Sequence, residues 1–149
     1  KRLPDTSGLA YWLKKLNAGT KLDQVSAQFA ASSEFKTKYG STTNTQFVTL
    51  VYDNIFDRAP DPSGLSYWVG RLDRGTRRGT VMTNFSESSE GQRRLSPYVN
   101  ATLLGLGMIA KLPTGDLLST MLDQSNGGSG TPEHAARVLL DSAEYAAGT

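Results

Sequence analysis

Hydrophobic side chains recur at helical spacing after Thr43, which together with Gln46 offers a capping-box start. The inward stripe that follows consists of Phe47, Leu50, Val51, Asn54 and Ile55. This pattern predicts an amphipathic helix over residues 44–57. Pro60 lies just beyond it, and because the residue before a proline is pushed out of the helical region, the helix is expected to stop there.

A second helix is predicted directly downstream, over about residues 62–73. Asp61 is a suitable N-cap, Pro62 fits the first helical position, and Gly75 fits a left-handed cap at the C-terminal end. The apolar stripe of this helix consists of Leu65, Trp68, Val69 and Leu72.

Three further helices follow from capping signals. Thr76 is expected to cap a helix that runs to about Glu87, with Val81 and Phe85 facing inward. Similar signals predict helices over residues 96–111, capped by Ser96-Pro97, and 131–146, capped by Thr131-Pro132. Residues 124–130 are rich in glycine and serine and are expected to form a loop. Because no window alternates with period two, no sheet is expected.

The chain contains an internal duplication. When residues 2–34 are placed on residues 58–90, an offset of 56, sixteen of the 33 positions are identical. The central identities are Pro4, Asp5, Gly8, Leu9, Tyr11 and Trp12, which match Pro60, Asp61, Gly64, Leu65, Tyr67 and Trp68. Self-similarity of this kind is typical of stacked supersecondary units.

A weaker third copy extends the repeat to the C-terminal end, since Leu139 and Ser142 follow Phe29 and Ser32 by 110 residues. We therefore predict an all-α fold of tandem three-helix repeats, about eight helices packed into one compact domain over residues 1–149. Its parts are a partial repeat over residues 1–40, a complete repeat over 41–95 and a degenerate repeat over 96–149. The counterpart of the helix at 44–57 is missing before Lys1, so we expect a longer parent protein to supply it.

Composition narrows the function only slightly. Of the 149 residues, 38% are apolar and 20% charged, the formal net charge is +2, and cysteine is absent. The lack of cysteine excludes disulfides and thiolate chemistry, and the small charge gives no reason to expect a nucleic-acid partner. No apolar run reaches the length of a membrane-spanning helix. A local arginine excess is expected to form a solvated face rather than a phosphate-binding track; it comprises Arg71, Arg74, Arg77, Arg78, Arg93 and Arg94.

The repeated aromatic pairs are the clearest candidates for a ligand platform. Trp12 and Trp68 fall on the core stripes of their helices and are expected to fill the interior. Tyr11 and Tyr67 lie at the edge of those stripes, where their hydroxyls could close local hydrogen bonds or stack on a sugar. Tyr98 is a further candidate for an exposed ligand contact.

Other candidate sites have simpler structural explanations. Asp5 and Asp61 could be calcium ligands, but a calcium loop needs several oxygen donors, so helix capping is the better interpretation. Gly8 and Gly64 indicate close helix contact more than approach of a ligand. His134, the single histidine, has no partners for a triad or a metal site. We expect no metal and no cofactor, and paired carboxylates for glycan hydrolysis remain a third alternative.

The segment from Arg58 to Trp68, followed by Leu72, Gly75, Val81, Phe85 and Ser88-Ser89-Glu90, resembles the bacterial family DUF4214. The similarity covers residues 2–95 well and the rest poorly. It implies an accessory helical module of a large exported or cell-surface protein, with no catalytic residue to carry over.

The resulting hypothesis is a non-catalytic interaction or spacer module of an extracellular or cell-surface protein that mediates adhesion or assembly. Its expected partners are other domains or cell-surface proteins. The alternative is a carbohydrate-binding module that uses Tyr11, Tyr67 or Tyr98. The two hypotheses differ in whether the repeated aromatic residues are buried or presented to a ligand.

Overall fold

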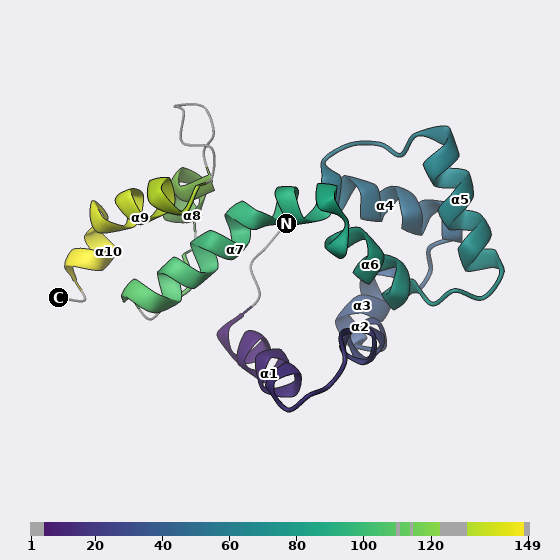
Figure 1. Cartoon of the computed structure of the whole chain (residues 1–149), viewed down its shortest axis with the longest axis horizontal. Coiled ribbons are helices and arrows are strands. Elements are labelled where there is room, and N and C mark those ends of the chain that lie inside the picture. Colours follow the sequence, from purple (N-terminus) through teal and green to yellow (C-terminus); the bar gives the residue numbers. More distant parts are fainter. Residues whose placement is uncertain (1–4, 110, 114, 123–130, 148–149) are drawn as a thin grey trace. The chain divides into compact units, whose positions relative to one another are not determined.

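The computed structural model describes residues 5–109, 111–113, 115–122 and 131–147. No strand is present among these residues, so the predicted all-α class is confirmed. The helices of this part of the chain, labelled in Figure 1, are α1 (Thr6–Asn17), α2 (Leu22–Ala30), α3 (Ser33–Tyr39), α4 (Asn44–Phe56), α5 (Pro62–Asp73), α6 (Arg78–Glu87), α7 (Ser89–Ile109), α8 (Gly115–Leu122), α9 (Pro132–Leu140) and α10 (Ala143–Ala146). The predicted loop at 124–130 lies outside the described residues.

The start of α4 confirms the predicted capping box. Thr43 Oγ1 accepts a hydrogen bond from the backbone N–H of Gln46 at 3.2 Å, and Gln46 Oε1 accepts one from the N–H of Thr43 at 2.9 Å. The helix ends at Phe56, within one residue of the predicted end at about residue 57. Asp57 adopts the left-handed conformation, with φ of 55°, and so ends the helix before Pro60 can act on it.

The two copies of the duplicated segment fold into matched helices. α1 and α5 have the same length and begin and end at the sequence offset of 56. Each is followed by a glycine with positive φ, 84° at Gly19 and 93° at Gly75. Glycine adopts this conformation without steric cost, so the predicted helix end at Gly75 is confirmed.

The predicted N-cap of α6 is wrong by one residue, because Thr76 does not cap this helix. The N–H of Thr76 donates to the carbonyl of Arg71 at 3.0 Å, so this residue belongs to the turn that closes α5. Arg77 occupies the N-cap position of α6, and α6 begins at Arg78. The inward positions Val81 and Phe85 are buried as predicted.

Serine side chains mark three helix boundaries; the end of α6 at Glu87 agrees with the prediction, whereas the breaks at Ser32 and Ser142 were not predicted. Ser32 and Ser88 each accept a hydrogen bond, through Oγ, from the backbone N–H three residues ahead, and these contacts start α3 and α7. Ser142 Oγ donates to the carbonyl of Leu139 at 2.6 Å. The helix predicted over residues 131–146 is therefore divided into α9 and α10.

α7 also begins earlier than predicted. It runs from Ser89, and Pro97 lies inside it rather than at its first position. Proline removes one intrahelical hydrogen bond. Because α7 begins at Ser89 and is 21 residues long, most of its other hydrogen bonds stay in place.

Packing divides the chain into two compact units, residues 10–94 and residues 1–9 together with 95–149. The single domain and the tandem three-helix arrangement drawn from the sequence stay predictions. The division after Arg94 falls close to the predicted repeat boundary at residues 95 and 96.

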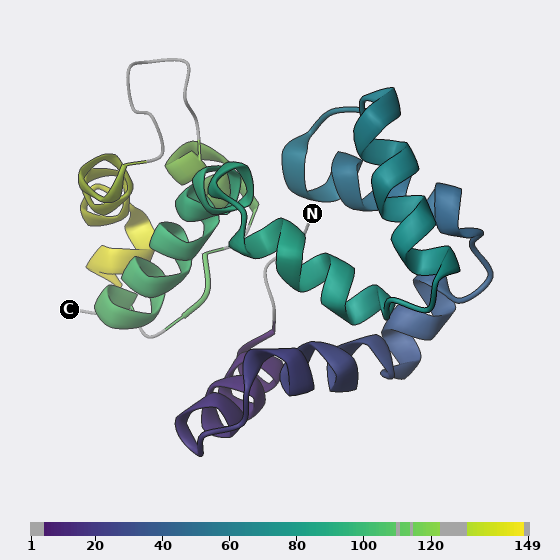
Figure 2. The same cartoon turned by 45° about the vertical axis from the view of Figure 1, so that its right-hand side comes forward.

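The core of residues 10–94 is built around α4, which packs against α5 and α6 (Figures 1 and 2). The predicted stripe positions Phe47, Val51 and Ile55 are buried, and α4 adds three more buried residues beside them: Val48, Tyr52 and Phe56. α2 packs along α6. These two helices occupy the same position in the two copies of the duplicated segment, so the matched helices lie side by side in this unit.

Residues 95–147 contain a smaller core of their own, formed where α8 packs against α9. Its buried members are Ala101, Met121, Ala135 and Leu139. Ala135 and Leu139 follow Val81 and Phe85 by 54 residues. The third copy therefore buries the same two helix positions as the second.

Candidate functional site

The repeated aspartates are helix caps with identical geometry. Asp61 Oδ1 accepts hydrogen bonds from the Ser63 hydroxyl at 2.6 Å and from the Gly64 N–H at 2.8 Å. Asp5 Oδ1 accepts the same two bonds, from Ser7 at 2.6 Å and Gly8 at 2.7 Å. The hydrogen bonds from Ser63 and Gly64 hold the pKa of Asp61 below its usual range. The Oδ1 atoms of both aspartates are thus engaged in helix capping, which explains the repeated aspartate without a calcium ion.

The repeated Tyr–Trp pairs also share one geometry. The ring centroids of Tyr11 and Trp12 lie 5.0 Å apart at 79°, and those of Tyr67 and Trp68 lie 5.0 Å apart at 81°. Both tyrosines are exposed, 51% for Tyr11 and 54% for Tyr67. The duplicated segment therefore presents two equivalent edge-to-face aromatic pairs.

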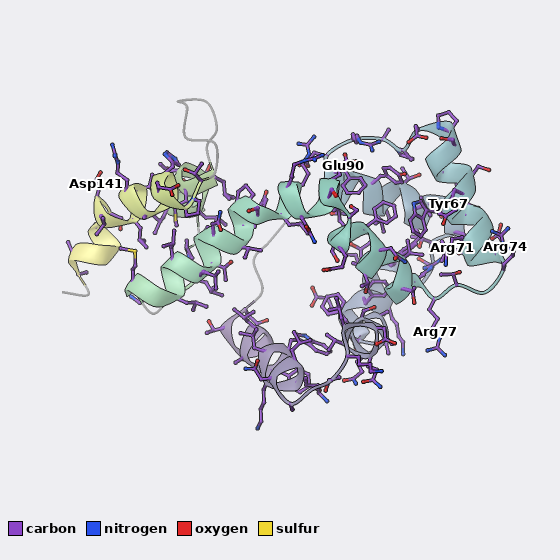
Figure 3. All side chains as sticks on the ribbon, in the orientation of Figure 1. Tyr67, Arg71, Arg74, Arg77, Glu90 and Asp141 are labelled. Atoms are coloured by element: carbon purple, nitrogen blue, oxygen red, sulfur yellow. The ribbon has the colours of Figure 1, made fainter. Side chains whose placement is uncertain are left out.

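A basic residue lies one turn after each tyrosine. Arg71 Nη1 donates to the Tyr67 hydroxyl at 3.0 Å, so the local hydrogen bond expected for this hydroxyl is present. Lys15 Nζ lies 5.3 Å from the Tyr11 ring centroid, within range for a cation–π contact. Figure 3 shows Tyr67 and Arg71 on α5 and Arg74 directly after its C-terminal end.

The tryptophans are half-buried rather than enclosed. Trp68 packs on the buried Phe85, with centroids 5.1 Å apart, and Trp12 packs on Phe29 at 6.0 Å. Trp68 thus packs on a core residue, as expected for an interior role, whereas Trp12 packs on a phenylalanine that is itself exposed. Leu9 and Leu65 are half-buried on the same stripes.

An ion pair between Arg58 and Glu90 is the main feature that the sequence analysis missed. Arg58 Nε and Nη2 each donate to one carboxylate oxygen of Glu90 at 2.9 Å. This bidentate hydrogen bonding raises the pKa of Arg58 and lowers the pKa of Glu90. The Arg58 guanidinium also lies over the rings of Tyr52 and Phe56, at 5.1 and 5.4 Å. Arg58 and Glu90 are each identical to the matched residue of the first copy, and this repetition was the only hint of the pair in the sequence.

Gly64 permits the close approach of α4 to α5. A Cβ at this position would collide with the Tyr52 hydroxyl, so the predicted helix contact is confirmed. Burial raises the pKa of Tyr52, and the nearby Asp61 carboxylate adds to the shift. At Gly8 the three described atoms nearest to the same Cβ position all belong to the Asp5 side chain, the nearest at 3.2 Å.

The arginine excess does not form one solvated face. Arg78 is half-buried: it donates to the carbonyls of Tyr39 and Thr42, and its guanidinium lies 4.7 Å from the Phe47 ring centroid. It therefore fastens the segment that leads into α4. Arg74 and Arg77 are exposed, and Figure 3 places Arg77 apart from Arg71 and Arg74, in the connection to α6.

The remaining candidates lie apart from the aromatic pairs in the sequence. His134 Nε2 lies 3.2 Å from the carbonyl oxygen of Thr120, a contact between α8 and α9. Tyr98 was expected to be exposed, but it is half-buried. Pro60 is half-buried before the Asp61 cap, and Pro4 lies outside the described residues. Within the described ranges no three His, Asp or Glu side chains gather as a metal site would require.

The largest difference between the two copies is an apolar surface on α1 and α2. We call it the α1–α2 face; it consists of Leu13, Leu16, Leu22 and Phe29, all exposed. Phe29 is 45% exposed, whereas its counterpart Phe85 is 2% exposed. Leu16 is 39% exposed, whereas Leu72 is 8% exposed. Within residues 10–94, no helix packs on α1 as α4 packs on α5.

These features define a helical module with two copies of one helix pair, α1–α2 and α5–α6. α4 packs on the second pair, whereas the α1–α2 face of the first pair is exposed. Residues 26–95 match the model of the family DUF4214, described as a domain of unknown function. The match begins inside α2, includes α3 to α6 and ends in the first part of α7. No curated protein and no solved structure matches the chain. None of the described helices is long and apolar enough to cross a membrane.

Proposed function

We propose that this chain is a non-catalytic helical interaction or spacer module of a larger bacterial extracellular or cell-surface protein, where it mediates adhesion or assembly. The single observation that carries the proposal is the α1–α2 face. Its side chains are exposed although the matched side chains Leu72 and Phe85 are buried. Exposed apolar side chains gathered on one pair of helices are typical of protein-interaction sites.

The non-catalytic part of the proposal is supported by what the charged groups do. Asp61 caps α5, and Glu90 is paired with Arg58. Both carboxylates have lowered pKa values, which suits a negative charge held in place rather than a proton donor near neutral pH. The extracellular location and the bacterial source rest on the family resemblance alone.

Site-specific cross-linking tests this function. A photoreactive phenylalanine analogue would replace Phe29 on the α1–α2 face and, as the matched control, Leu140, which is equally apolar and 49% exposed. Both proteins would be exposed to the surface fraction of cells that make the parent protein. We expect an identified protein or neighbouring domain to be cross-linked from position 29 and not from position 140. Equal or absent cross-linking at the two positions would contradict the proposal.

A carbohydrate-binding function is the second candidate, and the exposed tyrosines favour it. Tyr11 and Tyr67 present aromatic surface to solvent beside Lys15 and Arg71, and an exposed ring next to a hydrogen-bond donor suits a sugar. A glycan array with the unmodified chain and with the double variant Tyr11→Ala/Tyr67→Ala decides the question. Binding that the double variant loses would establish this function in place of protein interaction.

A further inference from the structure

We propose that the α1–α2 face binds an amphipathic helix of the α4 type, one that carries two aromatic side chains four residues apart. This inference rests on the proposed interaction function and names the chemistry of the partner. The duplicated copy in residues 44–87 supplies the evidence, because it shows what covers the matched surface there.

The burial of Phe85 comes largely from two rings of α4. The Phe85 centroid lies 4.9 Å from that of Tyr52 and 5.1 Å from that of Phe56, with the Phe56 ring stacked at 20°. Tyr52 and Phe56 are four residues apart and so lie on one side of α4. Together with Trp68, these two rings surround the Phe85 side chain, which is 2% exposed.

Phe29 shares with Phe85 the contact to the tryptophan of the preceding helix, but among the described residues it has no ring contact with α4. It contacts Trp12 at 6.0 Å and 57°, close to the 5.1 Å and 50° of the Trp68–Phe85 pair. Its second described aromatic neighbour is Phe35, at 6.3 Å. The Trp–Phe platform is therefore formed before a covering helix arrives, which lowers the entropic cost of binding one.

The third copy supports the same conclusion. Ala135 and Leu139, which match Val25 and Phe29 at the offset of 110, are fully buried within residues 95–147. Val25 is half-buried and Phe29 exposed. Of the three matched helices, α2 alone has an exposed side chain at the second of these positions.

The structure also indicates where the bound helix would lie. Tyr11 and Tyr67 have nearly equal exposure, 51% and 54%, so α4 does not cover Tyr67. The bound helix would therefore cover Leu16 and Phe29 and leave Tyr11 in solvent. This distinguishes helix binding from a sugar platform, which would use Tyr11.

A peptide of residues 41–60 of this chain, which contains α4 with its caps, is the probe. We expect fluorescence anisotropy to show saturable binding of the labelled peptide to the full chain. Phe29→Asp and, as a second variant, Leu16→Asp should each weaken binding at least about tenfold, while the control Leu140→Asp should not. A peptide with Tyr52→Ser and Phe56→Ser should not bind. Circular dichroism establishes that each chain variant is folded.

Three results would overturn the inference: no saturable binding, binding that both face variants retain, or a dimer of the free chain that Phe29→Asp dissociates. The last result would make a second copy of the chain the occupant. If the peptide fails but cross-linking from position 29 captures a defined protein, the interaction function stands and only the helix partner is wrong.

Discussion

The two helix pairs α1–α2 and α5–α6 share caps, turns and aromatic pairs but differ in what covers them. Asp5 and Asp61 make the same hydrogen bonds, and Gly19 and Gly75 have nearly the same φ. Yet α1 and α2 contain no buried residue along their described lengths, whereas α5 and α6 contribute Leu72, Val81 and Phe85 to the core. Local sequence therefore sets local geometry, and a neighbouring helix sets burial.

The largest effect should separate the two matched phenylalanines. Phe85→Ala removes a fully buried ring and leaves a cavity between α4 and α5, so we expect a loss of about 3–5 kcal/mol in the free energy of unfolding. Phe29→Ala removes a ring that is 45% exposed, so we expect a loss of about 1 kcal/mol. Urea denaturation of both variants measures the difference. Equal losses would show that the copies are equally covered in solution.

The repeated glycines give the next largest contrast. Gly64→Ala places a methyl group against the Tyr52 hydroxyl, so α4 must shift and stability should fall by about 1–3 kcal/mol. At Gly8→Ala the nearest described atom is an oxygen of the Asp5 carboxylate, at 3.2 Å, so stability should change by less than about 1 kcal/mol. Thermal melts of the two variants test this, and a larger loss at Gly8 would contradict it.

Acid should weaken the covered copy through Asp61 and Glu90. Both carboxylates have lowered pKa values in the folded chain, so they stabilise it fully above the unfolded values of about 3.9 and 4.3. This contribution is lost as the pH falls through the folded pKa values. We expect the Tm to fall below about pH 4, and the fall to be smaller in Asp61→Asn/Glu90→Gln. If the Tm of the double variant falls with pH as steeply as that of the unmodified chain, Asp61 and Glu90 do not cause the loss of stability in acid.

The smallest stability effect is expected at the exposed tyrosines. Tyr11→Ala and Tyr67→Ala should each change the free energy of unfolding by less than about 0.5–1 kcal/mol, because both rings are about half exposed. The two values should also agree, since the copies differ little at this position. A large loss for Tyr67 alone would mean that the Arg71 contact and the Trp68 packing hold α5 in place.

Much of the helical framework can be predicted from the sequence because it depends on short-range chemistry. The Asp61 cap, the capping box at Thr43 and the turn at Gly75 each follow from residues within one helical turn. The inward positions of α4 and α6 follow from their spacing. The duplication correctly indicates that the local structures of Asp5 and Asp61 are equivalent.

Features that join distant residues could not be predicted from these patterns. Arg58 and Glu90 are 32 residues apart, and their identity in both copies signals importance without indicating that they pair. The half-buried position of Arg78 depends on the carbonyls of Tyr39 and Thr42. The path of α7 through Pro97 depends on an earlier serine cap. Exposure of Phe29 depends on a neighbouring helix rather than on its own segment.

Single-tryptophan fluorescence tests the central claim most directly, because the chain has two tryptophans, one in each copy. Trp68→Phe leaves Trp12 as the reporter of α1–α2, and Trp12→Phe leaves Trp68 as the reporter of α5–α6. When the peptide of residues 41–60 is added, the Trp12 emission should shift to shorter wavelength, and the Trp68 emission should not change because α4 already covers that copy. A shift of Trp68 alone, or of neither, would contradict the account.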